Sequence, residues 1–205
     1  AQYFTIYDER FDGYVRSWQQ AGLVARWEGA IRVLEDGHIE PCRTLDVGCG
    51  TGATLVYLAK RGFEVTGIDI APTALEIAER TARREGVTGR WLSGSFPEEF
   101  PPTVLGDERF DFVIERGFLH MHTMPQEHAP ILAAIHRILR RGGTFYSLAA
   151  KREGARGFGG PPKWRESEIR AAMEPYFEII EMRCDVFTPG ETGSMPAWVT
   201  VMRPH

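Results

Sequence analysis

Three glycines at alternate positions, Gly48, Gly50 and Gly52, mark the stretch of this chain that is best able to do chemistry. Because glycine has no Cβ, one side of such a turn leaves bare backbone against which a ligand can lie. An apolar segment at 44–47 precedes the turn and predicts a buried strand, and the segment at about 53–60 predicts a helix. The first turn of that helix would add free N–H groups and the positive end of the helix dipole to the same ligand site.

An acid, Asp69, closes the next predicted strand at 63–68. In open α/β sheets a carboxylate at this place can accept hydrogen bonds from a ribose diol, so the stretch predicts a nucleotide-like cofactor. Two cofactor classes fit the glycines, because Gly48-x-Gly50-x-x-Ala53 also satisfies the dinucleotide pattern GxGxxG/A. A glycine-rich turn that binds no ligand is a third alternative.

Asp46 and the position of the third glycine favour one of these alternatives. The acid stands two residues before the first glycine, and the third glycine is residue 52 rather than 53. The run LDVGCGTG at 45–52 resembles motif I of the class I S-adenosylmethionine (SAM)-dependent methyltransferases. The resemblance implies SAM as cofactor and S-adenosylhomocysteine as its product. The residues that it assigns to SAM are Asp46, Gly48, Cys49, Gly50, Thr51, Gly52, Asp69 and Ile70.

Three further residues, Trp27, Ser95 and Phe96, join the predicted cofactor site, the first two through the same resemblance. Trp27 and Gly29 match a pair found before motif I in the thiopurine-methyltransferase-like group, where the tryptophan lies beside the cofactor. In the loop after a predicted strand at 90–92, Ser95 stands where the family has an acid that bonds the adenine amino group. A serine hydroxyl can also accept such a bond, and the ring of Phe96 could stack on the adenine.

A second informative stretch, ERGFLHMH at 115–122, follows a predicted strand at 110–114. Ligand-binding groups collect at such strand ends. The residues that match the family's order of acid, glycine, two apolar residues and histidine are Glu115, Gly117, Phe118, Leu119 and His120. The match implies that Glu115 contacts the cofactor. Methyltransferases acting on exocyclic amines of nucleic-acid bases carry Asn/Asp-Pro-Pro-aromatic at this place, which is absent from this chain.

His120 is the first candidate for a catalytic residue. The sulfonium of SAM already makes the methyl group electrophilic, so the protein must hold a nucleophile in line with the S–CH₃ bond and exclude water. A phenol, hydroxy-heterocycle or thiol would also have to lose its proton, and a histidine has an ordinary pKa of about 6.5. His122 is a second candidate base, and a hydrogen-bonded wall residue is the alternative role for His120.

Aromatic residues near the N-terminus predict either a packed helix or a lid. Tyr7, Phe11, Tyr14 and Trp18 fall at i, i+4, i+7 and i+11, one stripe of a helix. In the first alternative the stripe packs an N-terminal helix onto the domain. In the second, residues 1–30 form a lid that closes over cofactor and substrate, and both roles can hold together. The glycine- and proline-rich segment 151–165 is a connector or a flap, and its Gly-Gly-Pro at 159–161 resembles the Gly-Pro flap of the same family.

These aromatic side chains predict the substrate class. The predicted substrate residues are Tyr7, Phe11, Tyr14, Trp18, Phe118, His122 and Phe158. An apolar, aromatic wall suits a small, flat acceptor, so we predict methyl transfer to a hydroxyl or thiol of a small aromatic or hydrophobic molecule, as in the thiopurine and benzoquinone-type methyltransferases that the chain resembles. N-methylation, a different use of SAM, and a SAM-binding module without turnover are the alternatives.

Composition restricts the partners. The chain has 205 residues, 43% hydrophobic and 25% charged, a formal net charge of −4 and a pI near 5.9, which argues against nucleic acid as a partner. No apolar run approaches the length of a membrane span, and the first 30 residues contain charges throughout. We therefore expect a cytoplasmic protein without membrane association. Three cysteines without CxxC spacing predict reduced thiols, and the histidines lack metal-site spacing, so no metal is predicted. A monomer or homodimer is expected.

The remaining pattern predicts a single domain, residues 1–205, of the α/β class. We expect a Rossmann-like seven-stranded, mostly parallel sheet with helices on both faces and an antiparallel C-terminal hairpin strand. The other helices are predicted from Pro72 to about Gly86, at 126–140 and at 166–173, and the other strands at 144–149, 176–187 and 198–202.

Overall fold

The structure is a computed structural model that describes residues 39–100, 105, 109–122, 125–152, 163–187 and 195–205. The predicted N-terminal lid, including Trp27, and the predicted substrate residue Phe158 lie outside the described residues. The chain divides into two compact units, residues 1–96 with 189–192, and residues 97–188 with 193–205. Each unit is described by itself.

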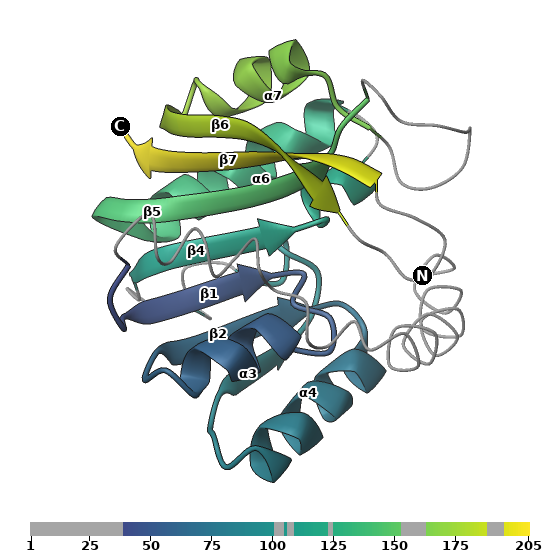
Figure 1. Ribbon diagram of the computed structural model, residues 1–205, viewed down its shortest axis with the longest axis vertical. Coiled ribbons are helices and arrows are strands. Elements are labelled where there is room, and N and C mark those ends of the chain that lie inside the picture. The colour runs from purple at the N-terminus through teal and green to yellow at the C-terminus, as the bar shows by residue number, and fades with distance from the viewer. Residues whose placement is uncertain (1–38, 101–104, 106–108, 123–124, 153–162, 188–194) are drawn as a thin grey trace. The chain divides into compact units, whose positions relative to one another are not determined.

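The first unit is a parallel βαβαβ arrangement (Figure 1). Its elements are β1 (Arg43–Val47), α3 (Ala53–Ala59), β2 (Glu64–Asp69), α4 (Pro72–Arg84) and β3 (Arg90–Ser93). Strand β2 pairs with β1 on one side and with β3 on the other, so the order is β3-β2-β1. Because both faces of such a strand are covered, β1 reads as a continuous buried run, with Leu45 and Val47 at 0% exposure.

Helix α4 illustrates how local sequence sets an element. Pro72 occupies the first helical turn, where its missing N–H is not needed. Ala74 and Ala78 are fully buried on one face of the helix, while the opposite face carries charged residues. The helix ends at Arg84, and Gly86 follows with a φ of 71°.

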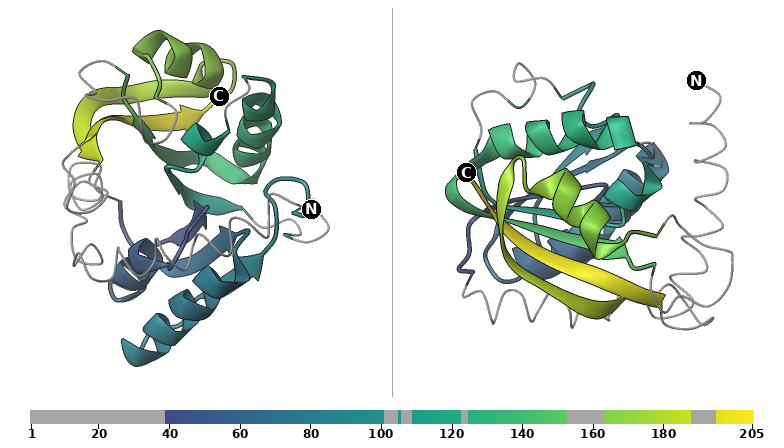
Figure 2. Two further views of the ribbon diagram at one scale, coloured as in Figure 1. Left: turned by 90° about the vertical axis from the view of Figure 1, so that its right-hand side faces the viewer. Right: turned by 90° about the horizontal axis from the view of Figure 1, so that it is seen from above.

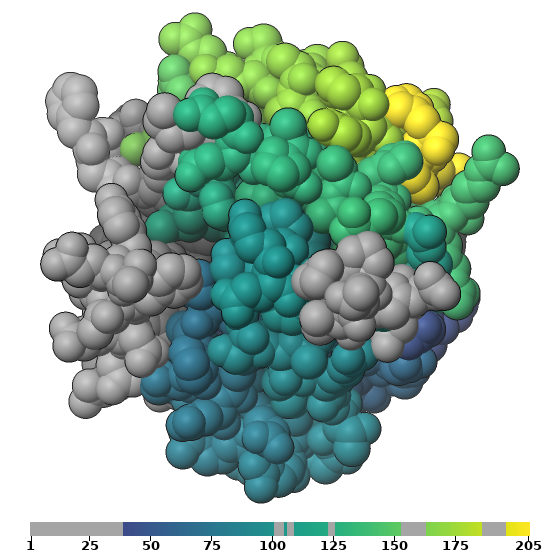
Figure 3. Space-filling view, turned by 180° about the vertical axis from the view of Figure 1, so that it is seen from behind, coloured from purple at the N-terminus to yellow at the C-terminus, as the bar shows by residue number. Residues whose placement is uncertain are grey.

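The second unit is a mixed sheet with two helices (Figure 2). Its elements are β4 (Phe110–Arg116), the 3₁₀ turn η2 (Leu119–Met121), α6 (Pro125–Ile138), β5 (Leu139–Ala150), α7 (Glu166–Met173), β6 (Phe177–Phe187) and β7 (Met195–Pro204). Strands β4 and β5 are parallel, and β7 runs antiparallel between β5 and β6. Helix α6 contacts β5, α7 contacts β6, and the two helices contact each other. They form one helical layer, with α7 in light green above α6 in Figure 3.

Aromatic packing and one cap hold this second unit together. Phe110, Phe145 and Phe177 are among its fully buried side chains, and the ring centroids of the last two are 5.2 Å apart. Helix α7 begins where the Arg165 N–H donates a hydrogen bond of 2.7 Å to the Glu168 carboxylate, half of a capping box.

Strand β6 contains a bulge. Ile179 pairs with Met202 and Glu181 pairs with Val201, so Ile180 is one extra residue on this strand. The side chain of Ile180 is 49% exposed. The extra residue reverses the alternation of side chains along β6. From Glu181 onward, each side chain lies on the sheet face opposite to the one it would occupy in a strand without the bulge.

The predicted fold class is confirmed in its elements. The described residues contain seven strands, parallel in the first unit and between β4 and β5, and antiparallel at the C-terminal end. Most boundaries differ by one or two residues, and the larger differences are in β5 and in β7, which runs from Met195 to Pro204 rather than from 198 to 202. Helix α6 ends at Ile138 rather than 140, and β5 begins at Leu139 rather than 144, because Leu139 pairs with Phe110 at the start of β4.

Candidate functional site

The glycine turn of the first unit lies at the carboxyl end of β1 and is fixed to the neighbouring strand. The N–H groups of Gly48 and Cys49 donate to the carbonyl oxygen of Ile68 over 2.8 and 3.0 Å. The φ angles of Gly48, Gly50 and Gly52 are 74°, 53° and 70°, in the left-handed region that side chains disfavour. The alternate glycines are therefore required by backbone conformation as well as by access for a ligand.

Asp69 holds the turn from the end of β2. Its Oδ2 accepts a hydrogen bond of 2.7 Å from the Gly50 N–H, and its Oδ1 accepts one of 2.9 Å from the Ala71 N–H. The residue is 9% exposed, and burial raises the pKa of its carboxyl while these backbone bonds oppose the rise. Each carboxylate oxygen has two lone pairs, so Asp69 can accept a further donor from a ligand.

Gly52 is the N-cap residue of α3, and no space is left beside it for a side chain. A Cβ at this position would lie 2.7 Å from the Cβ of Ala78 and 2.7 Å from Cζ3 of Trp91. Trp91 of β3 was not predicted as part of the site, although its bulk shapes the underside of the turn. No spacing in the sequence points to this role, because the contact joins two elements.

The other predicted cofactor residues of the first unit differ in exposure. Asp46, Cys49 and Phe96 are buried, and burial raises the pKa of the Cys49 thiol well above its ordinary value. The residues that are half-buried are Thr51, Ile70 and Ser95. All six lie in β1, in the glycine turn or at the carboxyl ends of β2 and β3, which is the edge of an α/β sheet where ligands bind.

In the second unit, Glu115 supports the turn that follows β4. The residue is 0% exposed, and its Oε2 accepts hydrogen bonds from the N–H groups of Phe118 at 3.0 Å and Leu119 at 3.1 Å. Its Oε1 accepts a hydrogen bond from the Ser147 hydroxyl of β5. Burial raises the pKa of Glu115 to about 7. The carboxylate is enclosed and holds the backbone of its own turn, and the predicted contact of Glu115 with the cofactor stays a prediction.

His120 lies in the turn that Glu115 supports. It is 3% exposed, and its Nδ1 accepts a hydrogen bond of 3.2 Å from the N–H of Ala150, the last residue of β5. Burial lowers the pKa of His120 to about 4. The imidazole is therefore neutral at pH 7. The bond from Ala150 was not predictable from spacing, since the two residues are 30 positions apart.

The turn also brings together two predicted substrate residues. The rings of Phe118 and His122 meet edge to face with centroids 4.8 Å apart, and both are half-buried. The carbonyl of His122 forms a 2.8 Å hydrogen bond with Nε2 of His128 on α6. Burial lowers the pKa of His122 as well. The predicted partners Tyr7, Phe11, Tyr14 and Trp18 lie outside the described residues.

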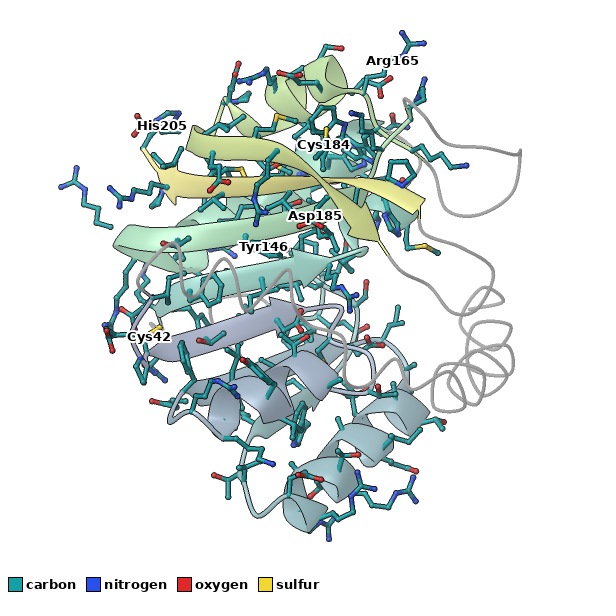
Figure 4. The ribbon with its side chains drawn as sticks, in the orientation of Figure 1. Cys42, Tyr146, Arg165, Cys184, Asp185 and His205 are labelled. Carbon is teal, nitrogen blue, oxygen red and sulfur yellow. The ribbon has the colours of Figure 1, made fainter. Side chains whose placement is uncertain are left out.

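The end of β5 carries a further polar contact that the sequence did not indicate. Lys151 Nζ lies 2.9 Å from Sγ of Cys184 on β6 and 4.1 Å from the ring centroid of Trp198 on β7. Figure 4 shows Cys184 on β6, beside Asp185 and above Tyr146 of β5. Cys184 is exposed, so this contact lies at the surface.

Neither a metal centre nor a spanning helix is found among the described residues. They contain no group of three or more His, Cys, Asp or Glu side chains that could hold a metal ion. No helix within the described ranges is long and apolar enough to cross a membrane.

Known proteins resemble this chain in sequence and in fold. Residues 44–143 match the family described as methyltransferase domain. The chain is 28% identical over 154 residues to the 2-heptyl-1-hydroxyquinolin-4(1H)-one methyltransferase of Mycobacteroides abscessus, covering 74% of this chain and 65% of that one. It is 30% identical over 132 residues to the ribosomal RNA small subunit methyltransferase C of Alcanivorax borkumensis, covering 62% and 38%. The chain thus spans less than two thirds of either relative.

A solved structure agrees over nearly the whole chain. The 1,6-didemethyltoxoflavin-N1-methyltransferase of Burkholderia thailandensis, with bound 1,6-didemethyltoxoflavin and S-adenosylhomocysteine, superposes with a TM-score of 0.72 at 23% identity. The match covers 99% of this chain and 86% of that chain, which shows a common fold. With the glycine turn and the family match, this identifies residues 44–143 as a class I S-adenosylmethionine-dependent methyltransferase domain, and the family predicted from the sequence is confirmed.

Proposed function

We propose that the chain transfers the methyl group of SAM to a hydroxyl or thiol of a small aromatic or hydrophobic molecule. The observation that carries the cofactor half of this proposal is the Asp69 carboxylate, which holds the Gly50 N–H at 2.7 Å beside a turn of three left-handed glycines. A carboxylate already oriented in this way, with lone pairs to spare, suits a ribose diol.

The proposed SAM site extends along the carboxyl ends of the first unit's strands. The glycine backbone would face the amino-acid part of SAM, and Asp69 would accept from the ribose hydroxyls. Ser95 would accept a hydrogen bond from the adenine amino group, with Phe96 and Trp27 beside the cofactor. Cys49, Thr51 and Ile70 would line the pocket through backbone and packing contacts.

The acceptor half rests on the turn after β4 and on the relatives. Phe118 and His122 offer a half-buried, aromatic edge-to-face pair, which suits a flat molecule. The quinolone and toxoflavin relatives are both named for flat heteroaromatic molecules, and the quinolone carries a hydroxyl. The toxoflavin enzyme is named for a ring nitrogen, which makes N-methylation of a heterocycle the second candidate.

A nucleic-acid acceptor is disfavoured despite the ribosomal RNA relative. The β4 exit reads Glu115-Arg116-Gly117-Phe118 and lacks the Asn/Asp-Pro-Pro-aromatic run of enzymes that methylate base amines. The formal net charge of −4 also disfavours attraction to a polyanion.

The chemistry asked of the protein is orientation and exclusion of water. The sulfonium supplies the electrophile, and holding a nucleophile in line with the S–CH₃ bond can account for roughly 7–11 kcal/mol of the barrier.

The test is release of S-adenosylhomocysteine from SAM in the presence of pooled phenols, hydroxyquinolines, quinols, thiols and heterocyclic amines. SAM binding is measured by calorimetry on the same protein. Turnover confined to hydroxyl or thiol acceptors is expected. Turnover of amines alone would replace the proposed acceptor class, and a protein that does not bind SAM would overturn the cofactor assignment.

A substitution at Asp69 tests the cofactor half separately. Asp69→Asn puts an amide N–H group where one carboxylate oxygen accepts a bond, so SAM affinity should fall by about 10- to 100-fold. The matched control is Glu64→Gln at the other end of β2, whose side chain is 68% exposed and pairs with Arg43. Equal affinities of the Asp69→Asn variant and the wild type would show that the ribose lies elsewhere.

A further inference from the structure

Trp91 of β3 fills a space left by three glycines that belong to three different segments of the first unit. A Cβ on Gly52, in the glycine turn, would lie 2.7 Å from Cζ3 of the indole. A Cβ on Gly67 in β2 would lie 3.0 Å from Cε3, and one on Gly89, just before β3, would lie 3.0 Å from Cζ2. The six-membered ring of the indole therefore packs against three stretches of bare backbone at once.

The strand register explains how the indole reaches the glycine turn. Trp91 is paired with Gly67, so the two residues face the same side of the sheet. Gly67 is paired in turn with Asp46 of β1, the strand that leads into the glycine turn. The ring can therefore extend from β3 over the bare backbone of β2 to Gly52, a path that a side chain at position 67 would block.

The two ends of the glycine turn are joined to β2 in different ways. Hydrogen bonds to β2 hold the first part of the turn, up to Gly50, which donates to Asp69 over 2.7 Å. The N–H of Gly52 donates within the turn instead, to the carbonyl oxygen of Cys49 at 3.0 Å. Gly52 packs against the indole, which also packs against Gly67. The ring thus sets the spacing between the second part of the turn and the strand that carries Asp69.

We infer that Trp91 is a positioning residue for SAM, because its ring fixes the place of the glycine turn relative to β2. This inference rests on the proposed function, in which the turn faces the amino-acid part of SAM and Asp69 accepts from the ribose. A binding site requires its parts to be held within about 0.5 Å of the productive geometry by the packing behind them. Trp91 supplies that packing through Gly52 and Gly67, without contact to the cofactor.

The test compares two ligands that share adenine and ribose. S-adenosylhomocysteine has the amino-acid chain on its sulfur, whereas 5′-methylthioadenosine has a methyl group there. Trp91→Leu removes the ring atoms that pack on Gly52, so the turn should shift while Asp69 stays in place. In calorimetric titrations the affinity for S-adenosylhomocysteine should fall by about 10- to 100-fold, and that for methylthioadenosine should stay within about 2-fold of the wild type.

Two further variants serve as comparisons. Trp91→Phe keeps a shorter ring, so it should show a smaller loss for S-adenosylhomocysteine alone, and it gives the same comparison if the Leu variant does not fold. Tyr57→Leu removes another half-buried ring of the first unit, which lies under the Arg61 guanidinium at 3.4 Å, and should leave both affinities unchanged.

Denaturant unfolding of each variant separates positioning from stability. A Trp91→Leu variant that is less stable but binds S-adenosylhomocysteine like the wild type would show that the ring only stabilises the fold. An equal loss of affinity for both ligands would show a general loosening of the site. Either result would overturn the inference.

Gly89→Ala tests the same ring from the opposite edge of the sheet. Gly89 precedes β3, whereas ligands bind at the carboxyl ends of such strands. Its new Cβ, 3.0 Å from Cζ2 of Trp91, would push the indole, so affinity for S-adenosylhomocysteine should fall. The same substitution in the Trp91→Leu background should cause no further loss. Equal effects in the two backgrounds, zero included, would contradict a role for Trp91.

Failure of the proposed function gives a different result. A wild-type protein that binds neither ligand would overturn the cofactor assignment itself. A wild-type protein that binds both, with Trp91 variants that bind both equally well, would overturn only the positioning role of Trp91.

Discussion

Two acids at strand ends show how similar residues come to different roles. Asp69 and Glu115 each accept hydrogen bonds from two backbone N–H groups. Asp69 keeps 9% of its surface exposed, whereas Glu115 is 0% exposed and also accepts from Ser147. The first can therefore meet a ligand, and the second serves the backbone that carries His120.

Glu115 should make stability depend on pH in an uncommon direction. Its pKa is about 7 in the folded protein against an ordinary 4.5, so the folded state holds a proton that the unfolded state releases. The stabilising contribution is complete below about pH 4.5 and is lost as the pH rises toward 7. A rise of that size corresponds to about 3 kcal/mol at most.

The measurement is the free energy of denaturant unfolding from about pH 4 to about pH 8. Glu115→Gln keeps an amide oxygen for the two N–H groups but does not titrate, so the difference between wild type and variant should shift in favour of the variant as the pH rises. The exposed Glu178→Gln serves as control. A difference independent of pH would mean that the pKa of Glu115 is the same in the folded and unfolded states.

The residue types of the cofactor turn were predictable from sequence, while the state of His120 was not. Gly48, Gly50, Gly52 and Asp69 form a local pattern whose backbone geometry follows from missing Cβ atoms and from strand ends. The hydrogen bond that Nδ1 of His120 accepts depends on an amide N–H brought from β5 by the pairing of β4 with β5. Spacing along the chain carries no information on that contact.

At the scale of elements, the glycine turn requires a left-handed backbone at Gly52 and also the absence of a side chain there. Gly52→Ala should destabilise the protein by about 2–4 kcal/mol, because a left-handed φ disfavours a side chain and the new Cβ would lie 2.7 Å from Ala78 and Trp91. The matched control is Gly86→Ala, since Gly86 has a φ of 71° but nothing within 4 Å of the new Cβ.

The control isolates the conformational penalty, which should be about 1–2 kcal/mol. Thermal or denaturant unfolding of both variants measures the two free energies. If the variants lose equal stability, the packing of Trp91 under the turn contributes nothing and the glycine at 52 is required by its φ alone.

The elements themselves were predictable where local signals agreed. Helix α7 occupies 166–173 as predicted, because acids in its first turn and Pro175 beyond its end mark both boundaries. The start of β5 was not predictable. The run Arg140-Arg141-Gly142-Gly143 has the composition of a helix end, but Leu139 pairs with Phe110 and Arg140 forms a 2.8 Å ion pair with Asp111. The start of β5 is therefore set by its pairing with β4 rather than by its own sequence.

At the scale of the whole molecule, the two compact units raise the question of cooperativity. We predicted a single domain over residues 1–205, and a ligand of the first unit can test this. SAM at about 100 times its Kd stabilises the native state by about 2.7 kcal/mol. If the units unfold together, the slowest-exchanging amides in β1–β3 and in β5–β7 should all exchange about 100-fold more slowly.

Hydrogen exchange with and without SAM makes this comparison amide by amide. The Asp69→Asn variant, at the same SAM concentration, shows how much of the protection comes from binding. Protection confined to the first unit would mean that the two units unfold independently and that the chain is not one cooperative domain.

The bulge at Ile180 bears on how this chain tolerates changes of length. Deleting Ile180 would bring Ile179 and Glu181 into consecutive pairs with Met202 and Val201, so the ladder would become regular without a shift elsewhere. A deletion at another position of β6 beyond the bulge would turn the following side chains to the opposite face. Removal of Ile180 thus keeps the register of β6. The irregular twist that the bulge adds also makes β6, an edge strand, a poor template for the addition of a second chain in fibres.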